Sequence, residues 1–172
     1  WFSGYTNLHQ PANYRFQYLK VEDGLPQNTI NAIAKDAYGF MWFGTNNGIC
    51  RFDGYSFETF KSDKNNQLSL PDNMISSIEP GNDNRIWIGS SNGLSYYDPG
   101  TENIWNYHTS DTTTPLITKV SSILSSKNEL WVATTSNGIF MLVPDKNGNY
   151  IEATHFGTHN STLTTHTINC LS

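Results

Sequence analysis

Charge is scarce in this sequence, and so are cysteine and long apolar runs. Charged residues make up 15% of the 172 residues, and the formal net charge is −5. No apolar run approaches the roughly 20 residues that a membrane helix needs. No cluster of Lys and Arg supplies the positive stripe that nucleic-acid binding requires. The sequence therefore argues against nucleic-acid binding by this chain and against a membrane helix within it.

The two cysteines, Cys50 and Cys170, lie in apolar, strand-like contexts. We interpret both as small buried hydrophobic residues. A disulfide in an oxidising compartment stays open, because two cysteines without geometry decide nothing. No metal-ligand spacing surrounds either of them.

Aromatic residues are abundant by contrast, with five Trp, nine Tyr and nine Phe. Asn, Thr, Ser and Gly are also frequent. Because each aromatic ring buries a large area, and because the net charge is low, disorder is disfavoured. The composition predicts a folded chain that is rich in turns.

A repeat of about 45 residues organises the sequence. Leu25-Pro-Gln-Asn-Thr-Ile30 returns as Leu70-Pro-Asp-Asn-Met-Ile75, and a third copy follows. A partial fourth copy begins at Leu163. The structural markers of the repeat are its tryptophans and the glycines of its Asn-Gly turns: Trp42, Trp87, Trp131, Gly48, Gly93 and Gly138.

Each repeat contains four short strand signals. Apolar triplets such as Met41-Trp42-Phe43 do not alternate with polar residues, which favours burial of both faces. The Asn-Gly pairs supply the positive φ angles of tight hairpins. Four strands per repeat of this length are typical of β-propeller blades. The sequence predicts an all-β fold of four-stranded antiparallel blades, in an incomplete arc of about three blades plus flanking strands.

The repeat boundaries divide the chain into six parts. They are an N-terminal lead (1–15), a closing strand of the last blade (16–24), blade 1 (25–62), blade 2 (63–110), blade 3 (111–160) and the truncated first strand of blade 4 (161–172). An arc of three blades cannot close, since propellers typically have four to eight. We therefore expect the 172 residues to be part of a larger ring, or several copies to associate, because open blade faces and edges are aggregation hazards.

Small residues recur after each apolar triplet, at Gly44, Gly89 and Ala133. They suit the crowded part of a propeller, where the blades converge. We expect close contacts between neighbouring blades at these positions.

The first two repeats resemble the two-component regulator propeller repeat. The resemblance rests on Leu-Pro-x-Asn-x-Ile-x-x-Ile, followed by Gly-Phe-Met-Trp-Phe-Gly-Thr-x-x-Gly-Ile-x-Arg-Phe-Asp-Gly. The leading Phe-x-Tyr-Leu-x-Val-Glu-Asp-Gly-Leu, from Phe16, is similar to the opening of sensor regions in Bacteroides-type hybrid two-component systems. The third repeat departs from the pattern, because Ala133 stands for Gly and Met141-Leu142 replaces the Arg-Phe pair.

The resemblance implies a function as well as a fold. Members of the family carry two seven-bladed propellers and a small β-sandwich in the periplasm, followed by a transmembrane segment, a histidine kinase, a receiver and a DNA-binding domain. They typically sense oligosaccharides. The resemblance implies that this chain is a periplasmic, ligand-sensing and non-catalytic portion of such a sensor. Its implied partners are an oligosaccharide, the remaining propeller blades and a second receptor copy, with membrane contact only through the absent transmembrane segment.

Catalytic and cofactor motifs are missing from the sequence, and we predict no catalytic residue, no metal and no cofactor. The five histidines lie mostly in polar, loop-like stretches, and His155 and His159 do not lie on a helix that could bring them to one metal. Several carboxylates recur at repeat-equivalent turns, which indicates turn chemistry rather than catalysis. These are Asp36, Asp53, Asp83 and Asp98.

Ligand binding is the better hypothesis, at the rim formed by the turns between second and third strands and the loops entering each first strand. Their amides and hydroxyls suit a neutral sugar, although Asn47, Asn92 and Asn137 are most simply turn formers. Trp105 stands where the first repeat has Glu58. Two interpretations stay open: an exposed Trp that stacks on a sugar ring, or a Trp that packs at a blade edge or a domain contact. The candidate ligand-binding residues are Asn28, Asn46, Asn73, Ser91, Trp105, Lys119 and Ser136.

Two other functions stay open at this point. The chain can belong to a propeller of a carbohydrate-active enzyme, a lyase or a glycosidase, whose acids lie in other blades. It can also be a structural interaction scaffold. Turnover by the whole protein would indicate the enzyme, and saturable binding without turnover the sensor.

Overall fold

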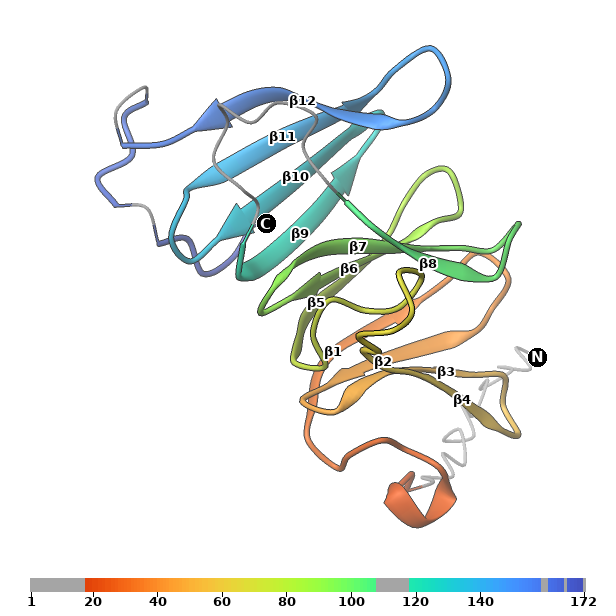
Figure 1. The fold of residues 1–172 in the computed structure, drawn as a ribbon. Helices are drawn as coiled ribbons and strands as arrows, with labels where there is room; N and C mark the ends of the chain where they lie inside the picture. The colour runs from red at the N-terminus through yellow and green to blue at the C-terminus, as the bar shows by residue number, and fades with distance from the viewer. Residues whose placement is uncertain (1–17, 108–117, 159–160, 166, 172) are drawn as a thin grey trace, which may run out of the picture.

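The strands form three separate four-stranded antiparallel sheets, each with its strands in sequence order. The computed structural model describes residues 18–107, 118–158, 161–165 and 167–171. Figure 1 shows the three sheets side by side in an open arc. The predicted all-β propeller architecture is confirmed for this part of the chain, and each sheet is a blade.

Each blade occupies one copy of the repeat. Blade 1 contains β1 (Ile30–Lys35), β2 (Met41–Thr45), β3 (Gly48–Phe52) and β4 (Phe57–Phe60). Blade 2 contains β5 (Ile75–Pro80), β6 (Ile86–Ser90), β7 (Gly93–Asp98) and β8 (Asn103–Asn106). Blade 3 contains β9 (Val120–Ser126), β10 (Glu129–Thr134), β11 (Ile139–Pro144) and β12 (Tyr150–Phe156).

The first strands of the blades converge and the last strands spread apart. Strand β1 contacts β5, and β5 contacts β9. The fourth strands β4, β8 and β12 lie on the outside of the arc (Figure 1). The inner end of each blade is therefore its most crowded part.

Two apolar cores hold the arc together, and each lies between consecutive blades. In the first, Trp42 of β2 packs with Ile75 and Ile88 of blade 2. In the second, Trp87 of β6 packs with Val120 and Leu130 of blade 3. Burial of one such aliphatic side chain contributes about 1.5–3 kcal/mol, so apolar contact between blades is the main source of cohesion.

Burial depends on whether a blade has a neighbour on both sides. All five residues of β6, in the middle blade, are buried. The flanking strands β2 and β10 are only partly buried. Ile33 of blade 1 is 59% exposed, whereas its repeat equivalents Ile78 and Ile123 are 7% and 6% exposed. Blade 1 thus presents an uncovered apolar face within the described structure, as expected for an open arc.

Glycine permits the closest approach between blades. A Cβ atom added to Gly44 would lie 2.6 Å from Cγ2 of Ile75, and one added to Gly89 would lie 2.5 Å from Cγ1 of Val120. Real Cβ contacts are longer than this, so the next blade's first strand occupies the space that a side chain would need. The expectation of close contacts is confirmed at these two positions.

A repeated hydrogen bond sets the register between blades. The second residue of each first strand donates from its side chain to a backbone carbonyl of the next copy, which in blades 2 and 3 belongs to the residue that begins the first strand. The pairs are Asn31 with Ile75 at 2.9 Å, Ser76 with Val120 at 2.6 Å, and Ser121 with Ile168. The side chains that make these bonds fall at a constant position of the repeat.

The segment 161–172 was expected to form the first strand of blade 4, and this prediction is wrong for its described residues, which form no strand. Ile168 nevertheless donates its backbone N–H to the Thr134 carbonyl at 3.1 Å. Leu171 donates to Oγ of Ser122 at 3.2 Å, as Ile123 does to Ser77. The segment docks at the place of a next blade, but isolated bonds of this kind do not make a ladder.

The predicted closing strand at 16–24 is also wrong over its described residues. Val21–Asp23 forms a 3₁₀ turn, in which the Lys20 N–H donates to Oδ2 of Asp23 at 2.9 Å. Gly24 ends the turn with a φ of 116°. Residues 16 and 17 and the lead 1–15 lie outside the described residues.

None of the described residues belongs to a helix long and apolar enough to cross a membrane.

The cysteines differ from each other. Cys50 is buried, as predicted, and burial raises its pKa to about 12, which keeps the thiol protonated and unreactive. Cys170 is exposed, so the prediction that both are buried is wrong for this residue. It occupies the repeat position of Ser77 and Ser122, whose side chains face the following copy.

The close approach at Gly89 gives a direct test of blade packing. We expect Gly89→Ala to lower the free energy of unfolding by about 1–3 kcal/mol, because the added methyl overlaps Val120. Urea denaturation of the 172-residue chain measures the change. Gly100→Ala is the matched control, since a Cβ there meets only Oδ1 of Asp98 at 3.3 Å. Equal stability of the two variants would contradict the packing described here.

Candidate functional site

A fully buried hydroxyl closes the hairpin between the second and third strand of every blade. Oγ1 of Thr45 donates to the Gly48 carbonyl at 2.8 Å and accepts the Asn47 N–H at 2.9 Å. Ser90 and Thr134 make the same two bonds in blades 2 and 3. The turns of the rim are therefore held in one geometry throughout the arc.

The asparagines that follow these hydroxyls tie the rim to the loops that enter the blades. Nδ2 of Asn47 donates to the Pro26 carbonyl at 3.1 Å, and Nδ2 of Asn92 lies 3.5 Å from the Pro71 carbonyl. This supports the interpretation of these asparagines as structural turn residues.

The structure places six of the seven candidate residues at one end of the blades. Because the strands are antiparallel, the starts of the first strands and the turns between second and third strands share that end. Asn28, Asn73 and Lys119 lie before β1, β5 and β9, while Asn46, Ser91 and Ser136 lie after β2, β6 and β10. Trp105 lies instead on the outermost strand of blade 2, β8.

Polar contacts already order several of these rim side chains. Oδ1 of Asn46 accepts a bond from Nδ2 of Asn31 at 2.7 Å, and Oδ1 of Asn73 accepts the Ser62 N–H at 2.8 Å. Likewise, Oγ of Ser136 lies 3.2 Å from Oγ1 of Thr118. An amide offers two donors and two lone pairs, so each amide keeps capacity to bond a hydroxylated ligand.

The other three rim candidates also take part in hydrogen bonds, one through its side chain and two through the backbone. Oδ1 of Asn28 accepts the Val21 N–H at 3.1 Å, and the Lys119 carbonyl accepts the Thr135 N–H at 3.0 Å. The Ser91 N–H donates to the Met74 carbonyl at 3.1 Å. These bonds join the entering loops to neighbouring turns, so the rim is a set of fixed polar groups.

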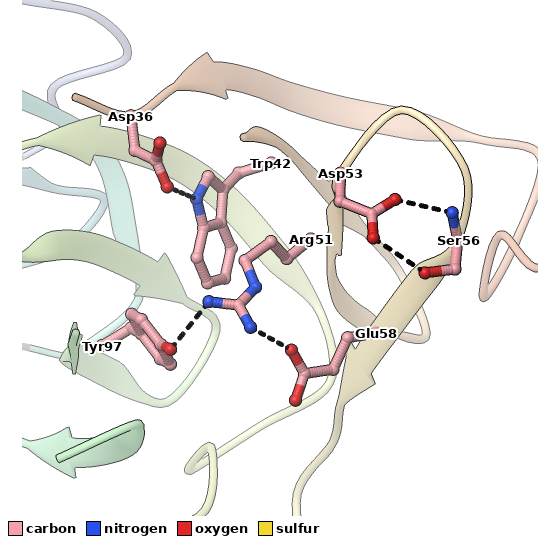
Figure 2. A network of polar contacts seen from close by, with 7 residues as sticks. All are labelled: Asp36, Trp42, Arg51, Asp53, Ser56, Glu58 and Tyr97. Carbon is pink, nitrogen blue, oxygen red and sulfur yellow. Dashed lines mark hydrogen bonds and ion pairs between the residues drawn. The ribbon is translucent and has the colours of Figure 1, made fainter. Parts of the chain in front are cut away.

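Figure 2 shows a second polar cluster, between blades 1 and 2. Arg51 of β3 donates to Oη of Tyr97 on β7 at 2.9 Å and forms an ion pair with Glu58 of β4 at 2.6 Å. Burial raises the pKa of Tyr97 despite the nearby guanidinium, so its hydroxyl stays neutral. Because the partners come from both blades, the cluster ties blades together rather than forming an open site.

Arg51 also contacts an aromatic ring, and blade 2 contains an equivalent cation–ring pair in which the two residues have exchanged strands. The Arg51 guanidinium lies 4.8 Å from the centroid of the Phe40 ring, and the Arg85 guanidinium lies 4.8 Å from that of Tyr96. Arg85 occupies the repeat position of Phe40, and Tyr96 that of Arg51. The cation and the ring have changed strands while their contact is kept, which is consistent with a stabilising role.

The recurring carboxylates accept hydrogen bonds in turns, which confirms their predicted role. Oδ1 of Asp53 accepts the backbone N–H groups of Ser56 and Tyr55, both at 2.7 Å, and these bonds lower the Asp53 pKa (Figure 2). Asp83 accepts the Arg85 N–H at 3.2 Å. Asp98 accepts the N–H of Gly100 at 2.8 Å.

The three repeat tryptophans differ in how their indole N–H groups are satisfied. Asp36 accepts the Trp42 Nε1–H at 2.9 Å, in addition to two backbone N–H groups (Figure 2). Glu129 accepts the Trp131 Nε1–H at 3.0 Å. Trp87 Nε1 is buried and has no acceptor within the described residues. The cause is that Gly81 stands where blade 1 has Asp36.

His155 does not lie in a solvated loop, and the sequence interpretation is wrong for it. It lies on β12, stacks on Phe140 with ring centroids 4.5 Å apart, and its Nε2 lies 2.6 Å from the Asn137 carbonyl. The other four histidines lie outside the described residues. Within the described ranges, no group of three or more His, Cys, Asp or Glu side chains gathers as a metal site.

Two hollows lie beyond the rim turns, and sequence reasoning missed most of their residues. One, of about 440 Å³, is lined by Gln67, Leu68, Trp105 and Asn106. Another, of about 160 Å³, lies between blades 2 and 3 at the end of the blades away from the rim. The available signal for the first was Trp105, which stands where the first repeat has Glu58. Nothing in the repeat pattern indicates the second, which is lined by Asn82, Asp83, Lys127, Asn128, Pro144, Gly148 and Tyr150.

Comparison with known proteins identifies the repeats. The family model of the two-component regulator propeller matches residues 24–47 and 69–92, which are the Leu-Pro and Trp-containing parts of the first two copies. The first two repeats of this chain are two-component regulator propeller repeats.

Solved structures with the same arrangement come from B. thetaiotaomicron. The extracellular domain of a hybrid two-component system is 30% identical, with a TM-score of 0.76, over 89% of this chain and 22% of that one. A second such domain is 25% identical, with a TM-score of 0.73, over 91% of this chain and 23% of that one. These likenesses extend the regulator propeller fold over the third blade.

A curated relative is a histidine kinase, P4, of Formosa agariphila. It is 31% identical over 61 residues, which are 36% of this chain and 4% of that protein. This chain therefore spans less than a quarter of the length of the relatives it matches.

The Asp36 carboxylate of the first regulator propeller repeat gives a test of turn chemistry. We expect Asp36→Ala to lower the free energy of unfolding by about 1–3 kcal/mol, because a buried indole N–H and two backbone N–H groups lose their acceptor. Urea denaturation measures the loss. Asp83→Ala is the control, since Asp83 serves only Arg85 and should cost at most about 1 kcal/mol. Equal losses would refute the role assigned to Asp36.

Glu79 of β5 predicts a pH dependence. Burial raises its pKa above the ordinary value of 4.5, and the Ser125 N–H, which donates to Oε1 at 2.9 Å, opposes this only in part. The folded state then binds the proton more tightly, so this contribution to stability is present below pH 4.5 and is lost as the pH rises through the folded pKa.

We expect Glu79→Gln, which keeps an acceptor for Ser125, to gain stability relative to the parent chain as the pH rises from 4 to 7. Thermal unfolding across this pH range measures the difference. Glu22→Gln, which removes an exposed carboxylate from the Val21–Asp23 turn, is the control. A pH-independent difference between parent and Glu79→Gln would overturn the assignment.

Proposed function

We propose that this chain is part of the periplasmic, ligand-sensing propeller of a hybrid two-component sensor. Three observations support the proposal: the regulator propeller repeats, the likeness to extracellular domains of such systems, and the open arc of three blades. In that sensor the chain's neighbours are the remaining propeller blades and a second receptor copy. The uncovered face around Ile33 is where a preceding blade would pack, since its equivalents Ile78 and Ile123 are covered in that way.

The ligand that we propose is an oligosaccharide. The observation that carries this choice is the rim, where buried hydroxyls hold every turn and leave amide and hydroxyl groups in fixed places. Among the seven candidate residues only Lys119 carries a charge. Fixed uncharged donors and acceptors suit a neutral polyhydroxylated ligand, because binding then costs little reorganisation of the protein.

The chain's role in this proposal is binding without turnover. Asp36, Asp53, Asp83 and Asp98 are engaged with backbone groups of their own turns, which leaves them poorly placed for acid–base chemistry. A bound oligosaccharide changes the sensor only if it binds two receptor arrangements with different affinity. The propeller would supply that difference, and parts outside this chain would transmit it.

The test uses the complete extracellular region that contains this chain. We expect calorimetry to detect saturable binding of a neutral oligosaccharide, with no new reducing ends after long incubation. Asn46→Ala and Asn73→Ala remove rim amides, and each should weaken binding about tenfold or more, which equals about 1.4 kcal/mol. Tyr55→Ala, an exposed residue of the turn between β3 and β4, is the matched control. Release of shortened sugars would favour an enzyme instead, and absence of any glycan binding would overturn the proposal.

A further inference from the structure

A hollow of about 440 Å³ lies at the outer margin of blade 2. Trp105 and Asn106 of β8 line one side of it, and Gln67 and Leu68, from the connection between blades 1 and 2, line the other. Its volume falls in the range of small-ligand sites. Because β8 runs toward the rim, the hollow lies at the rim end of the blade but outside the ring of rim turns.

Trp105 departs from the repeat. Its equivalents, opposite the same position of the third strand, are Glu58 in blade 1 and Thr154 in blade 3. The side chain is 40% exposed, and its Nε1 lies 3.5 Å from Oγ1 of Thr101. Blades 1 and 3 form the same sheet without an indole at this place, so blade formation does not require it.

The connection that forms the opposite side of the hollow is internally fixed. Oγ of the buried Ser69 accepts the Asp63 N–H at 3.0 Å and lies 2.7 Å from the Asn66 carbonyl, to which it can donate. Oδ1 of Asn66 accepts the Leu68 N–H at 2.9 Å. The hollow therefore has a wall that is organised before any ligand arrives, which lowers the cost of binding.

Two primary amides flank the indole. Nδ2 of Asn106 donates to the Ser69 carbonyl at 3.1 Å, and its Oδ1 accepts from Ser95 Oγ at 2.9 Å, so the orientation of this amide is set. Each of its polar atoms keeps one further bonding position. Gln67 is exposed, and its side chain makes no hydrogen bond within the described ranges.

We propose that this hollow binds a neutral saccharide unit, with the apolar face of a sugar ring against the Trp105 indole and its hydroxyls bonded to the amides of Asn106 and Gln67. Its described lining residues favour this ligand, because they join an aromatic face and the Leu68 side chain with two amides and include no charged side chain. The inference rests on the proposed function and deepens it, by placing a sugar subsite outside the rim. The connection links the two places, since it also carries Asn73.

The experiment titrates the folded 172-residue chain with neutral gluco-, manno-, xylo- and galacto-oligosaccharides, and with an oligogalacturonate as the charged comparison. Isothermal titration calorimetry reports binding, because its signal does not depend on Trp105, and circular dichroism verifies folding of each variant. We expect a saturable change with at least one neutral sugar. Trp105→Ala should weaken that binding at least about tenfold, and Trp105→Phe, which keeps a flat ring, should weaken it less. Tyr55→Ala removes an exposed aromatic that lines no hollow and should have no effect.

Sugar binding that survives Trp105→Ala would overturn the subsite, and so would a folded chain that binds none of the neutral sugars. Burial of Trp105 by a protein partner in place of a sugar would overturn it as well. The proposed function is judged separately, by sugar binding to the complete extracellular region. If that region binds sugar equally well with Trp105→Ala, the subsite fails and the proposed function stands. If it binds none, the proposed function itself fails.

Discussion

The fold depends on how closely one blade can approach the next. Gly44 and Gly89 leave room for Ile75 and Val120, and the second residue of each first strand then reaches the backbone of the next copy. Apolar packing has no direction of its own, so the tight fit at glycine and the hydrogen bond beside it give the stack its register. The tryptophans extend the same contact outward, since Trp42 meets Tyr97 and Trp87 meets Tyr150 across successive blade boundaries.

Around that contact, some interactions return in another copy with different residues, and others are lost. The cation and ring of Arg51 and Phe40 return in blade 2 with exchanged places, as Arg85 and Tyr96. The indole acceptor moves from Asp36 in blade 1 to Glu129 in blade 3, while Gly81 leaves Trp87 without one in the described part of blade 2. A buried donor without an acceptor costs about 1–3 kcal/mol.

Most of the architecture could be predicted from the sequence because its signals are local and repeated. Asn-Gly turns, apolar triplets and small residues at Gly44 and Gly89 act within one copy or between adjacent copies. The segments at 16–24 and 161–172 could not be predicted in this way. A strand needs a partner as well as a suitable sequence, and the described residues there find only single bonds or a local turn. The place of His155 in a strand was missed for a related reason, since its stacking depends on Phe140 in the neighbouring strand.

The candidate site was likewise predictable only in part from the sequence. Rim positions follow from strand order, so six of the seven candidates fall at one end of the blades. The hollow beside Trp105 depends on the path of the connection between β4 and β5, which strand order does not specify. The inner strands pack against the next blade, whereas β8 borders solvent on one side: its Ile104 is buried in the core between blades 1 and 2, but its Trp105 is exposed. An indole at an outer strand, where the other copies carry Glu58 and Thr154, therefore belongs to the part of the propeller that is free to acquire specificity.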